Sequence, residues 1–273
     1  MILTFDNVGK AYGEIRALDD LSFRVDRDEI VAVLGPNGAG KTTTLEIALG
    51  LRDADSGSVR LFEDSPHNIK ARRRLGVTPQ ESGFPDMLSV DEIVAYVAEH
   101  YPQPASVRET LERFGLGALA KRRAGTLSKG ESRRLAVSLA FVGNAEFVVL
   151  DEPTTGLDVE SRRRLWDVVR DIGKRRSILF TTHYLEEAQA LATRILVIDR
   201  GRLLFDGDPE GLRERFGGRR LSYVGTSGPV VVTTSDTDGY VRALVNENVA
   251  FADLEITRPS LEEAFLALTG GTK

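Results

Sequence analysis

The chain has 273 residues, a formal net charge of −5 and no cysteine. This length favours one large domain with an appendage, or two domains, and the charge argues against a protein that binds nucleic acid through a basic face. The missing cysteines exclude disulfides, thiolate zinc sites and cysteine nucleophiles. The N-terminus lacks the apolar core of a signal peptide, and no apolar run reaches the roughly 18 residues of a membrane span, so any role at a membrane needs a partner.

The first strands are expected at the N-terminus. Residues 2 to 26 alternate between apolar and polar side chains, and SGSVRLF at 56 to 62 is another strand-like segment. Alternation of this kind is typical of antiparallel sheets with one solvated face. We expect these segments to form one antiparallel edge sheet.

A glycine-rich loop follows the first strongly apolar run. EIVAVLG at 29 to 35 suits a central parallel strand, and it leads into GPNGAGKTT at 35 to 43 and then a helical pattern. The loop fits G-x-x-x-x-G-K-[ST], in which backbone N–H groups and a helix N-terminus surround phosphate oxygens. Lys41 would pair with the β and γ phosphates, and the Thr42 hydroxyl would bind Mg²⁺. The predicted phosphate-binding residues are Gly35, Pro36, Asn37, Gly38, Ala39, Gly40, Lys41, Thr42 and Thr43.

Strand patterns disappear between residues 84 and 141. SVDE at 89 to 92 is a capping box that would open a helix through His100, RETLERFGL indicates a second helix, and Gly130 would open a third. The sequence therefore predicts a helical subdomain, at about residues 84 to 141, inserted into the core.

Strand patterns return after the helical region as EFVVLDEP at 146 to 153, SILFTTH at 177 to 183 and RILVIDRG at 194 to 201. The first of them delivers Asp151 and Glu152 at its carboxyl end, the edge where ligands bind in open α/β sheets. Asp151 would hold Mg²⁺, and Glu152 would orient and activate an attacking water. FTTH brings His183 to the same rim, although on its own His183 would be taken for a structural or capping histidine.

The C-terminal part changes character after about Gly207. DPEGLRERFGG predicts a short helix that ends at glycines, and residues 220 to 273 follow the order strand, strand, helix, strand, helix. The expected fold class is α/β, a P-loop NTPase core with an antiparallel β subdomain, an inserted α-helical subdomain and a small C-terminal α+β appendage. We expect a cassette domain at 1–210 and a small domain at 211–273.

Seven elements together resemble the nucleotide-binding subunits of ABC transporters. They are Tyr12, the loop at 35 to 43, Gln80 after RLGVTP, LSKGE at 127 to 131, VVLDEP at 148 to 153, GLD at 156 to 158 and His183. Each short element is a weak sign alone, but seven in this order and spacing are highly specific, and they cover residues 2 to about 210. The resemblance implies an ATP hydrolase whose cofactors are ATP and Mg²⁺.

The resemblance also implies individual roles. Tyr12 resembles the aromatic residue that stacks on adenine, with a tyrosine over the core as the structural alternative. Gln80 resembles the glutamine that reaches Mg²⁺ and the water, and His183 the histidine that grips the γ-phosphate beside Glu152. Asp158 resembles the acid that crosses to the opposite subunit, and on local chemistry it is equally a helix cap. The implied catalytic residues are Glu152, His183 and Gln80. The implied metal ligands are Thr42, Gln80 and Asp151.

The LSKGE loop resembles the signature loop that closes over the nucleotide of a facing subunit. Ser128 and Gly130 keep the hydroxyl and the close backbone approach, and the helix that follows would aim its N-terminus at the γ-phosphate. Lys129 stands where the family has glycine, and Glu131 where it has glutamine. Lys129 either adds charge near the transferred phosphate or is an exposed bystander. The implied partner is a second cassette, the same or a related one, joined on ATP binding.

The main interpretation is the ATPase subunit of an exporter with a separate transmembrane permease, which would hold it, as a cytoplasmic protein, at the inner face of the membrane. The tail RPSLEEAFLALTG at 258 to 270 resembles the end of bacterial ATPases paired with small permeases, including exporters of the daunorubicin type. The same tail is an amphipathic helix with a Ser260 cap and Glu263 three residues later.

Two alternative functions remain open from the sequence. One is a soluble member of the superfamily that acts on nucleic acid or the ribosome, supported only by arginine clusters such as 133 to 134, most of which are typical of solvated helix faces. The other is a regulator that binds ATP without turnover, which Glu152 and His183 disfavour. No nucleic-acid partner is expected.

Overall fold

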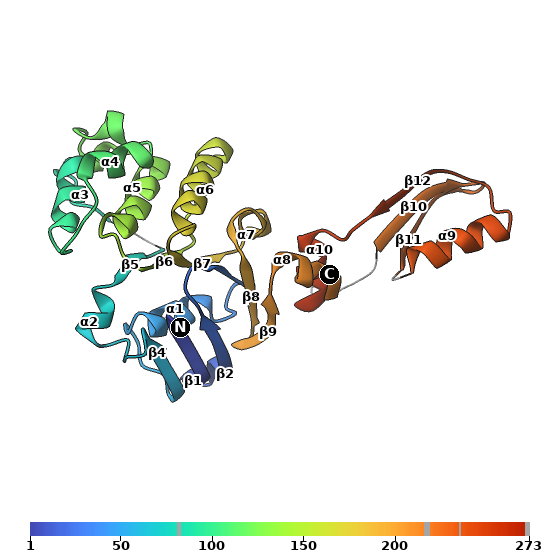
Figure 1. Cartoon of the computed structure of the whole chain (residues 1–273), viewed down its shortest axis with the longest axis horizontal. Coiled ribbons are helices and arrows are strands. Elements are labelled where there is room, and N and C mark those ends of the chain that lie inside the picture. Colours follow the sequence, from blue (N-terminus) through green and yellow to red (C-terminus); the bar gives the residue numbers. More distant parts are fainter. Residues whose placement is uncertain (81–82, 216–218, 235, 271–273) are drawn as a thin grey trace. The chain divides into compact units, whose positions relative to one another are not determined.

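The computed structural model describes residues 1–80, 83–215, 219–234 and 236–270. It divides into two compact units, Met1–Asp206 and Gly207–Lys273. Within its described residues, the larger unit contains a parallel sheet, an antiparallel sheet and a group of helices (Figure 1).

The centre of the larger unit is a six-stranded sheet with the order β5-β6-β7-β3-β8-β9. Its strands are β3 (Ile30–Leu34), β5 (Leu75–Thr78), β6 (Phe147–Asp151), β7 (Ser177–Thr182), β8 (Arg194–Asp199) and β9 (Arg202–Gly207). The pairs from β5 to β8 are parallel, and β3, β6 and β7 are buried along their whole length. This arrangement confirms the predicted buried strands and brings the carboxyl ends of β6, β7 and β3 to one edge of the sheet.

The antiparallel sheet has the order β2-β1-β4 and confirms the predicted edge sheet. Its strands are β1 (Leu3–Tyr12), β2 (Ile15–Val25) and β4 (Ser56–Leu61). Apolar residues of this sheet share one core with the central sheet and with helix α1 (Lys41–Ala48), and within it the rings of Phe5 and Phe23 stack at 4.6 Å. The short helix α2 (Ile69–Arg72) follows β4.

The helical subdomain contains α3 (Val90–Ala98), α4 (Val107–Arg113) and α5 (Lys129–Val142), which pack against one another, and α5 also packs on β5. In Figure 1 these helices stand together, apart from α1 and the antiparallel sheet. Two 3₁₀ turns, Gly117–Leu119 and Ala124–Thr126, connect α4 to α5. Two further helices, α6 (Val159–Gly173) and α7 (Leu185–Leu191), follow β6 and β7.

The predicted helix boundaries need small corrections. The capping box at Ser89 is confirmed, but α3 ends at Ala98 rather than at His100. The second helix ends at Arg113, because Gly115 takes a left-handed conformation with φ of 66°. The third helix begins at Lys129 and not at Gly130.

The smaller unit, described by itself, has a three-stranded antiparallel sheet with the order β11-β10-β12. Its elements are α8 (Pro209–Arg215), β10 (Arg219–Gly225), β11 (Gly228–Thr234), α9 (Thr237–Asn246), β12 (Phe251–Thr257) and α10 (Leu261–Leu268). They follow the predicted order, and the predicted Ser260 cap with Glu263 is confirmed. The glycines expected to end α8, at 217 and 218, lie outside the described residues.

The structure confirms the predicted α/β fold class, with its antiparallel sheet, inserted helices and small C-terminal unit. Within the described ranges, the helices are too short or too polar to cross a lipid bilayer.

Candidate active site

The glycine-rich loop connects β3 to α1 at the carboxyl edge of the central sheet. Gly40 caps α1 with φ of 104°, and a Cβ atom there would meet the Ala17 carbonyl oxygen at 2.5 Å, so the position requires glycine. Pro36, Asn37 and Gly38 form the exposed part of the loop. The loop therefore presents its backbone and the N-terminus of α1 to one side, the arrangement that binds phosphate groups.

Lys41 lies beneath this loop with 8% of its surface exposed. Its Nζ atom donates hydrogen bonds to the carbonyl oxygens of Gly35 at 2.8 Å and Pro36 at 3.0 Å. Burial lowers the pKa of Lys41, while the charges of Glu152 and Asp151 raise it. The structure thus brings the loop lysine and both predicted carboxylates into one electrostatic site.

The last residue of β6 is Asp151, and Thr181 of β7 holds it. The Thr181 hydroxyl donates to Asp151 Oδ1 and accepts a hydrogen bond from the Glu152 backbone N–H at 3.0 Å. Burial raises the pKa of Asp151, and the hydrogen bond from Thr181 opposes this effect. Two neighbouring strand ends therefore fix the positions of both carboxylates.

Glu152 is held at both of its carboxylate oxygens. His183 Nδ1 lies 3.3 Å from Oε1, and the Thr155 hydroxyl donates to Oε2 at 3.0 Å. The Glu152 backbone has φ of 47°, a sparsely populated region for this residue type. The predicted contact between Glu152 and His183 is present, and the strained backbone is typical of functional positions.

The donors available for Mg²⁺ are oxygen atoms, as this hard cation prefers. Thr42 is exposed in the first turn of α1, Gln80 is exposed after β5, and Asp151 ends β6. Among the described residues, no three histidines, cysteines or acids gather into an all-protein metal cage. The set fits a Mg²⁺ ion that keeps water and phosphate oxygens as its other ligands.

Gln80 joins this group through its backbone and not through a side-chain contact. Its carbonyl oxygen accepts a hydrogen bond from Arg133 Nη1 at 3.0 Å, and the same guanidinium donates to the Glu152 carbonyl oxygen at 2.9 Å. Most of the arginine clusters were expected on solvated helix faces, but Arg133 is buried and is an exception. The signal that could have placed Arg133 inside is its position on the same face of the helix as the buried residues Ala136, Val137 and Ala140.

The signature-like loop forms a second group of predicted residues. Ser128 is the N-cap of α5, its Oγ accepting from the Glu131 backbone N–H at 3.2 Å while Glu131 Oε2 accepts from the Ser128 N–H at 2.7 Å. This capping box explains an acid at Glu131, and the sequence analysis missed it. Ser128 and Lys129 are exposed.

The second group also contains the predicted acid Asp158. It caps α6 by accepting from the Ser161 N–H at 2.9 Å and the Ser161 hydroxyl at 2.7 Å, as local chemistry predicted. A Cβ atom on Gly130 would lie 3.5 Å from the side chain of Leu157, the neighbour of Asp158. Ser128, Gly130 and Asp158 therefore lie at two neighbouring helix N-termini.

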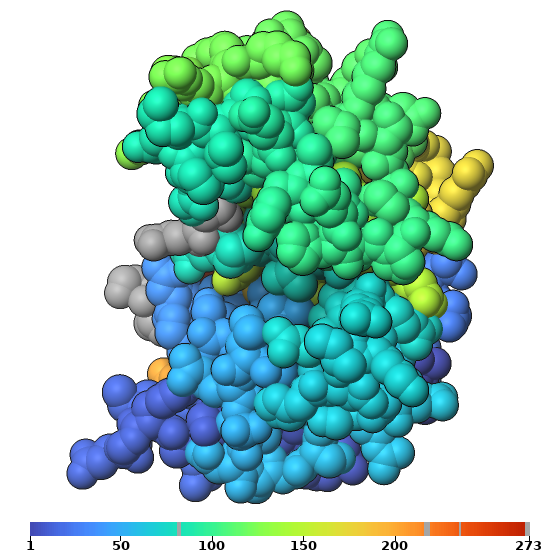
Figure 2. Space-filling view, turned by 90° about the vertical axis from the view of Figure 1, so that its left-hand side faces the viewer, coloured from blue at the N-terminus to red at the C-terminus, as the bar shows by residue number. Residues whose placement is uncertain are grey.

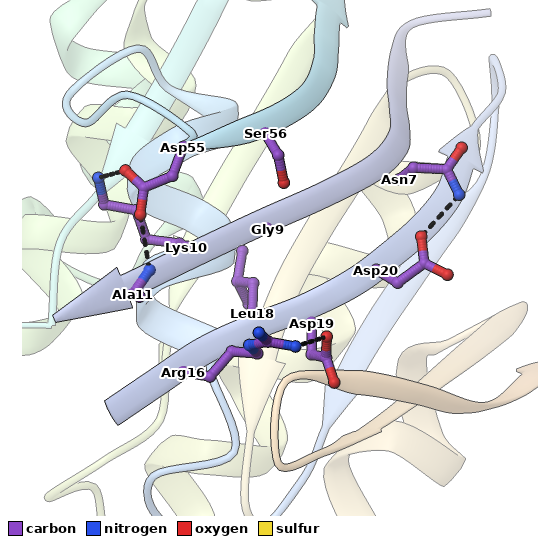
Figure 3. Close-up of a pocket in the computed structure, with 10 residues that line it drawn as sticks. All are labelled: Asn7, Gly9, Lys10, Ala11, Arg16, Leu18, Asp19, Asp20, Asp55 and Ser56. Carbon is purple, nitrogen blue, oxygen red and sulfur yellow. Dashed lines mark hydrogen bonds and ion pairs between the residues drawn. The ribbon is translucent and has the colours of Figure 1, made fainter. Parts of the chain in front are cut away.

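Tyr12 is the last residue of β1, and its ring contacts are with residues outside the two groups of site residues described above. Its ring is 39% exposed and faces Arg52 at 5.2 Å and Lys10 at 5.8 Å. Figure 3 shows the pocket that flanks this strand, in which the Asp55 carboxylate binds Lys10 Nζ at 2.6 Å and the Ala11 N–H at 2.8 Å. Asp55 thus fixes the strand end that presents Tyr12, and the exposed ring does not match the alternative of a tyrosine over the core.

Comparison with known proteins agrees with this geometry. The model of the ABC transporter family matches residues 18–155. The daunorubicin resistance ATP-binding protein DrrA3 of Streptomyces coeruleorubidus is 35% identical over 98% of this chain and 96% of its own length. The Nod factor export ATP-binding protein I of Paraburkholderia xenovorans (strain LB400) is 39% identical over 77% of this chain and 72% of its own.

A solved structure supports the fold. A dimeric ATP-binding cassette bound to ADP and Pi, in a post-hydrolysis state, superposes with a TM-score of 0.69. It is 23% identical in sequence and covers 76% of this chain and 98% of its own.

Proposed function

Because the chain belongs to the ABC transporter family, as an ATP-binding subunit with the ATPase fold, we propose that it works in pairs to drive export through a separate permease. The observation that carries the proposal is the contact between Glu152 and His183 beside Lys41, since it joins a base, its partner and a phosphate-binding lysine. The comparisons give the nucleic-acid alternative no support.

In this proposal each chain supplies most of one ATP site. The backbone of the loop at 35 to 43 and the Lys41 ammonium bind the phosphates, and the exposed ring of Tyr12 stacks on the adenine. Thr42, Asp151 and Gln80 would hold a Mg²⁺ ion, which would supply positive charge beside the phosphate oxygens.

Glu152 is the proposed general base. One of its oxygens accepts a proton from the attacking water, while His183 and Thr155 restrict the carboxylate to one orientation. His183 is exposed, so its ring can also reach the γ-phosphate.

The second half of each site would come from the facing cassette. Ser128 and Gly130 lie exposed or half-buried at the start of a 14-residue helix, and Asp158 lies beside them. Two cassettes, identical or related, would sandwich two ATP molecules, because a symmetric pair uses one surface twice. The matched cassette structure is itself dimeric, which supports this arrangement.

The helical subdomain would bind the permease, and this contact would hold the chain at the inner face of the membrane. Met87 and Tyr96 are 68% and 63% exposed and Leu88 is 37% exposed, so the segment that follows Gln80 carries three exposed apolar side chains. Figure 2 shows this part of the chain, in green-blue, on the surface above α2 and β4. Exposed apolar patches mark protein contacts, and the names of the relatives support an export partner for this chain.

The docking surface can be tested with Met87→Asp and Tyr96→Asp. Either change puts charge on the proposed apolar contact, so co-purification with a co-expressed permease partner should be lost. Basal ATP turnover should stay within about twofold, because neither residue contacts the site. The matched control is Val245→Asp, an equally exposed position in α9 of the smaller unit. Normal co-purification of both docking variants would move the contact elsewhere.

Glu152→Gln tests the proposed activity itself. The substitution keeps the shape of the side chain and removes the base, so turnover should fall at least about 100-fold while ATP still binds. Glu186→Gln, an exposed acid three residues after His183, is the control and should turn over normally. The measurement is steady-state phosphate release, and near-normal release by Glu152→Gln would refute the proposal.

The proposal assigns the ATPase to residues 1–210 and treats 211–273 as a separate C-terminal domain. The division of the chain into compact units at Asp206 and Gly207 supports a domain boundary near this position.

A further inference from the structure

Arg133 in α5 uses every donor of its guanidinium group on the backbone of two other segments. The side chain is 8% exposed, and each of its five N–H groups has a carbonyl oxygen as acceptor. The acceptors are the carbonyl oxygens of Pro79 (2.8 Å), Gln80 (3.0 Å), Asp151, Glu152 (2.9 Å) and Pro153 (3.2 Å). One side chain thus joins the segment after β5 to the segment after β6.

Burial of the Arg133 guanidinium has a desolvation cost, which its five hydrogen bonds offset. Burial lowers the pKa of the Arg133 guanidinium, although the neighbouring carboxylates of Asp151, Glu152 and Glu187 favour its charged form. Removing only this group would leave its carbonyl acceptors unpaired inside the protein, which is destabilising. A fully paired guanidinium is the side chain best suited to hold several carbonyl groups in fixed positions.

The position of Arg133 along α5 links the two groups of site residues. It lies five residues after Ser128, about 7.5 Å along the helix axis at the usual rise per residue. The backbone of Glu152, with its φ of 47°, is one of the segments that it holds. A rigid helix therefore connects the loop at Ser128 to the base and to Gln80.

We propose that Arg133 is a positioning residue that sets the orientation of Glu152 and Gln80 according to the placement of α5. When Ser128 meets the nucleotide of the facing cassette, α5 and its guanidinium hold the base of its own chain in the productive position. This inference depends on the proposed ATPase function, because it concerns the same base. It differs from a purely structural role in predicting a loss of turnover without a loss of ATP binding.

The test uses the full chain with Arg133→Lys, Arg133→Gln and the control Arg134→Lys. Lysine offers three donors and glutamine two, so both leave some of the five carbonyl groups unpaired. Arg134 is the next residue of α5, is half-buried, and donates only to the Gly115 carbonyl oxygen at 3.4 Å. It carries the same side chain on the same helix without contacting the site.

The expected result is a split between kcat and binding. Arg133→Lys should lower kcat about 10- to 100-fold, since a small misplacement of a catalytic group costs up to about 100-fold. Arg133→Gln should lower it further, while the Kd of Mg-ATP stays within about twofold of wild type in both variants. Arg134→Lys should match wild type in kcat and Kd. In a Glu152→Gln background, Arg133→Lys should cause no further loss, because the group that it positions is already absent.

Three outcomes would overturn the inference. They are a normal kcat in Arg133→Lys and Arg133→Gln, a parallel loss of ATP binding in both, or a full additional loss of turnover in the Glu152→Gln background. Wild type and Glu152→Gln are measured in the same series. Normal turnover by Glu152→Gln would refute the proposed ATPase function itself, whereas an inactive Glu152→Gln with active Arg133 variants would refute only the role of Arg133.

Discussion

Two loops of this chain place glycine and a hydroxyl residue at the N-terminus of a helix, yet their surroundings differ. The loop at 35 to 43 closes over Lys41, which is buried and lies in the field of Asp151 and Glu152. The loop at 127 to 131 has an exposed Ser128 whose hydroxyl and N–H groups form hydrogen bonds with Glu131 of its own helix. The first loop belongs to the proposed ATP site, and the second is an exposed helix N-terminus.

The difference between the loops indicates how one sequence could supply both halves of the proposed site. A buried lysine cannot serve a distant ligand, whereas an exposed, capped helix N-terminus keeps its partial positive charge for a negatively charged group outside the chain. The capping box keeps Ser128 and Gly130 in place before any partner arrives, so little order has to be gained on association. The comparison predicts that damage to the two loops has different consequences.

The largest expected effect is on dimer formation. Glu152→Gln should accumulate dimers with Mg-ATP, because hydrolysis no longer removes the ligand that stabilises the closed pair. Adding Ser128→Arg puts a bulky side chain at both ATP sites of the dimer interface. Association should therefore weaken by at least about 100-fold, as expected when two central contacts are lost. Analytical ultracentrifugation of the single and double variants measures this difference.

A matched control accompanies the dimer experiment. Ser106→Arg alters another exposed N-cap serine, that of α4, and should leave dimers of Glu152→Gln intact. Equal dimerisation of Glu152→Gln with and without Ser128→Arg would show that the two loops do not meet across an interface.

The next effect separates the loops in the monomer. Lys41→Met removes the ammonium group and leaves the carbonyl groups of Gly35 and Pro36 unpaired, so monomer affinity for Mg-ATP should fall about 10- to 100-fold, the range of one or two charged hydrogen bonds. Ser128→Arg should leave monomer affinity within about twofold of wild type. Equilibrium binding of Mg-ATP, at protein concentrations too low for dimers, measures the affinity of each variant. Weaker binding in Ser128→Arg would place both loops in one site of one chain.

Much of this fold could be predicted from the sequence because its signals are local. Strands apolar on both faces, such as those at 30–34 and 147–151, are typical of a covered parallel sheet. The loop at 35 to 43 was recognised from its G-x-x-x-x-G-K-[ST] motif, and Asp151 and Glu152 from their place at the carboxyl end of a strand. Glu152 and His183 lie close together because they follow adjacent parallel strands.

The remaining features depend on tertiary contacts that short motifs do not contain. Arg133 and Arg134 are identical neighbours in the sequence, but one lies on the buried face of α5 with five carbonyl acceptors and the other is half-buried. Thr181 belonged to a predicted strand, yet its role between Asp151 and Glu152 depends on the pairing of β6 with β7. Side-chain hydrogen bonds across elements are therefore the part that sequence patterns left out.

The smallest expected effect concerns the acid that replaces glutamine in the exposed loop. Glu131 accepts from the Ser128 N–H and pairs with Arg122 at 3.0 Å, and these contacts hold its pKa below the ordinary value of 4.5. Glu131→Gln keeps an acceptor for the cap but loses the charge, so at pH 7 the folded variant should be less stable than wild type by about 0.5 kcal/mol, as for a charge near a helix N-terminus or a surface ion pair.

A carboxylate whose folded pKa is depressed contributes stability above its unfolded pKa and loses it as the pH falls through the folded value. The difference in unfolding free energy between wild type and Glu131→Gln should therefore be constant at neutral pH and close as the pH drops below 4.5. Urea titrations from pH 7 downward measure it, with Glu14→Gln in the exposed turn between β1 and β2 as the control. A difference that persisted unchanged at acid pH would mean that the charge of Glu131 does not support the loop.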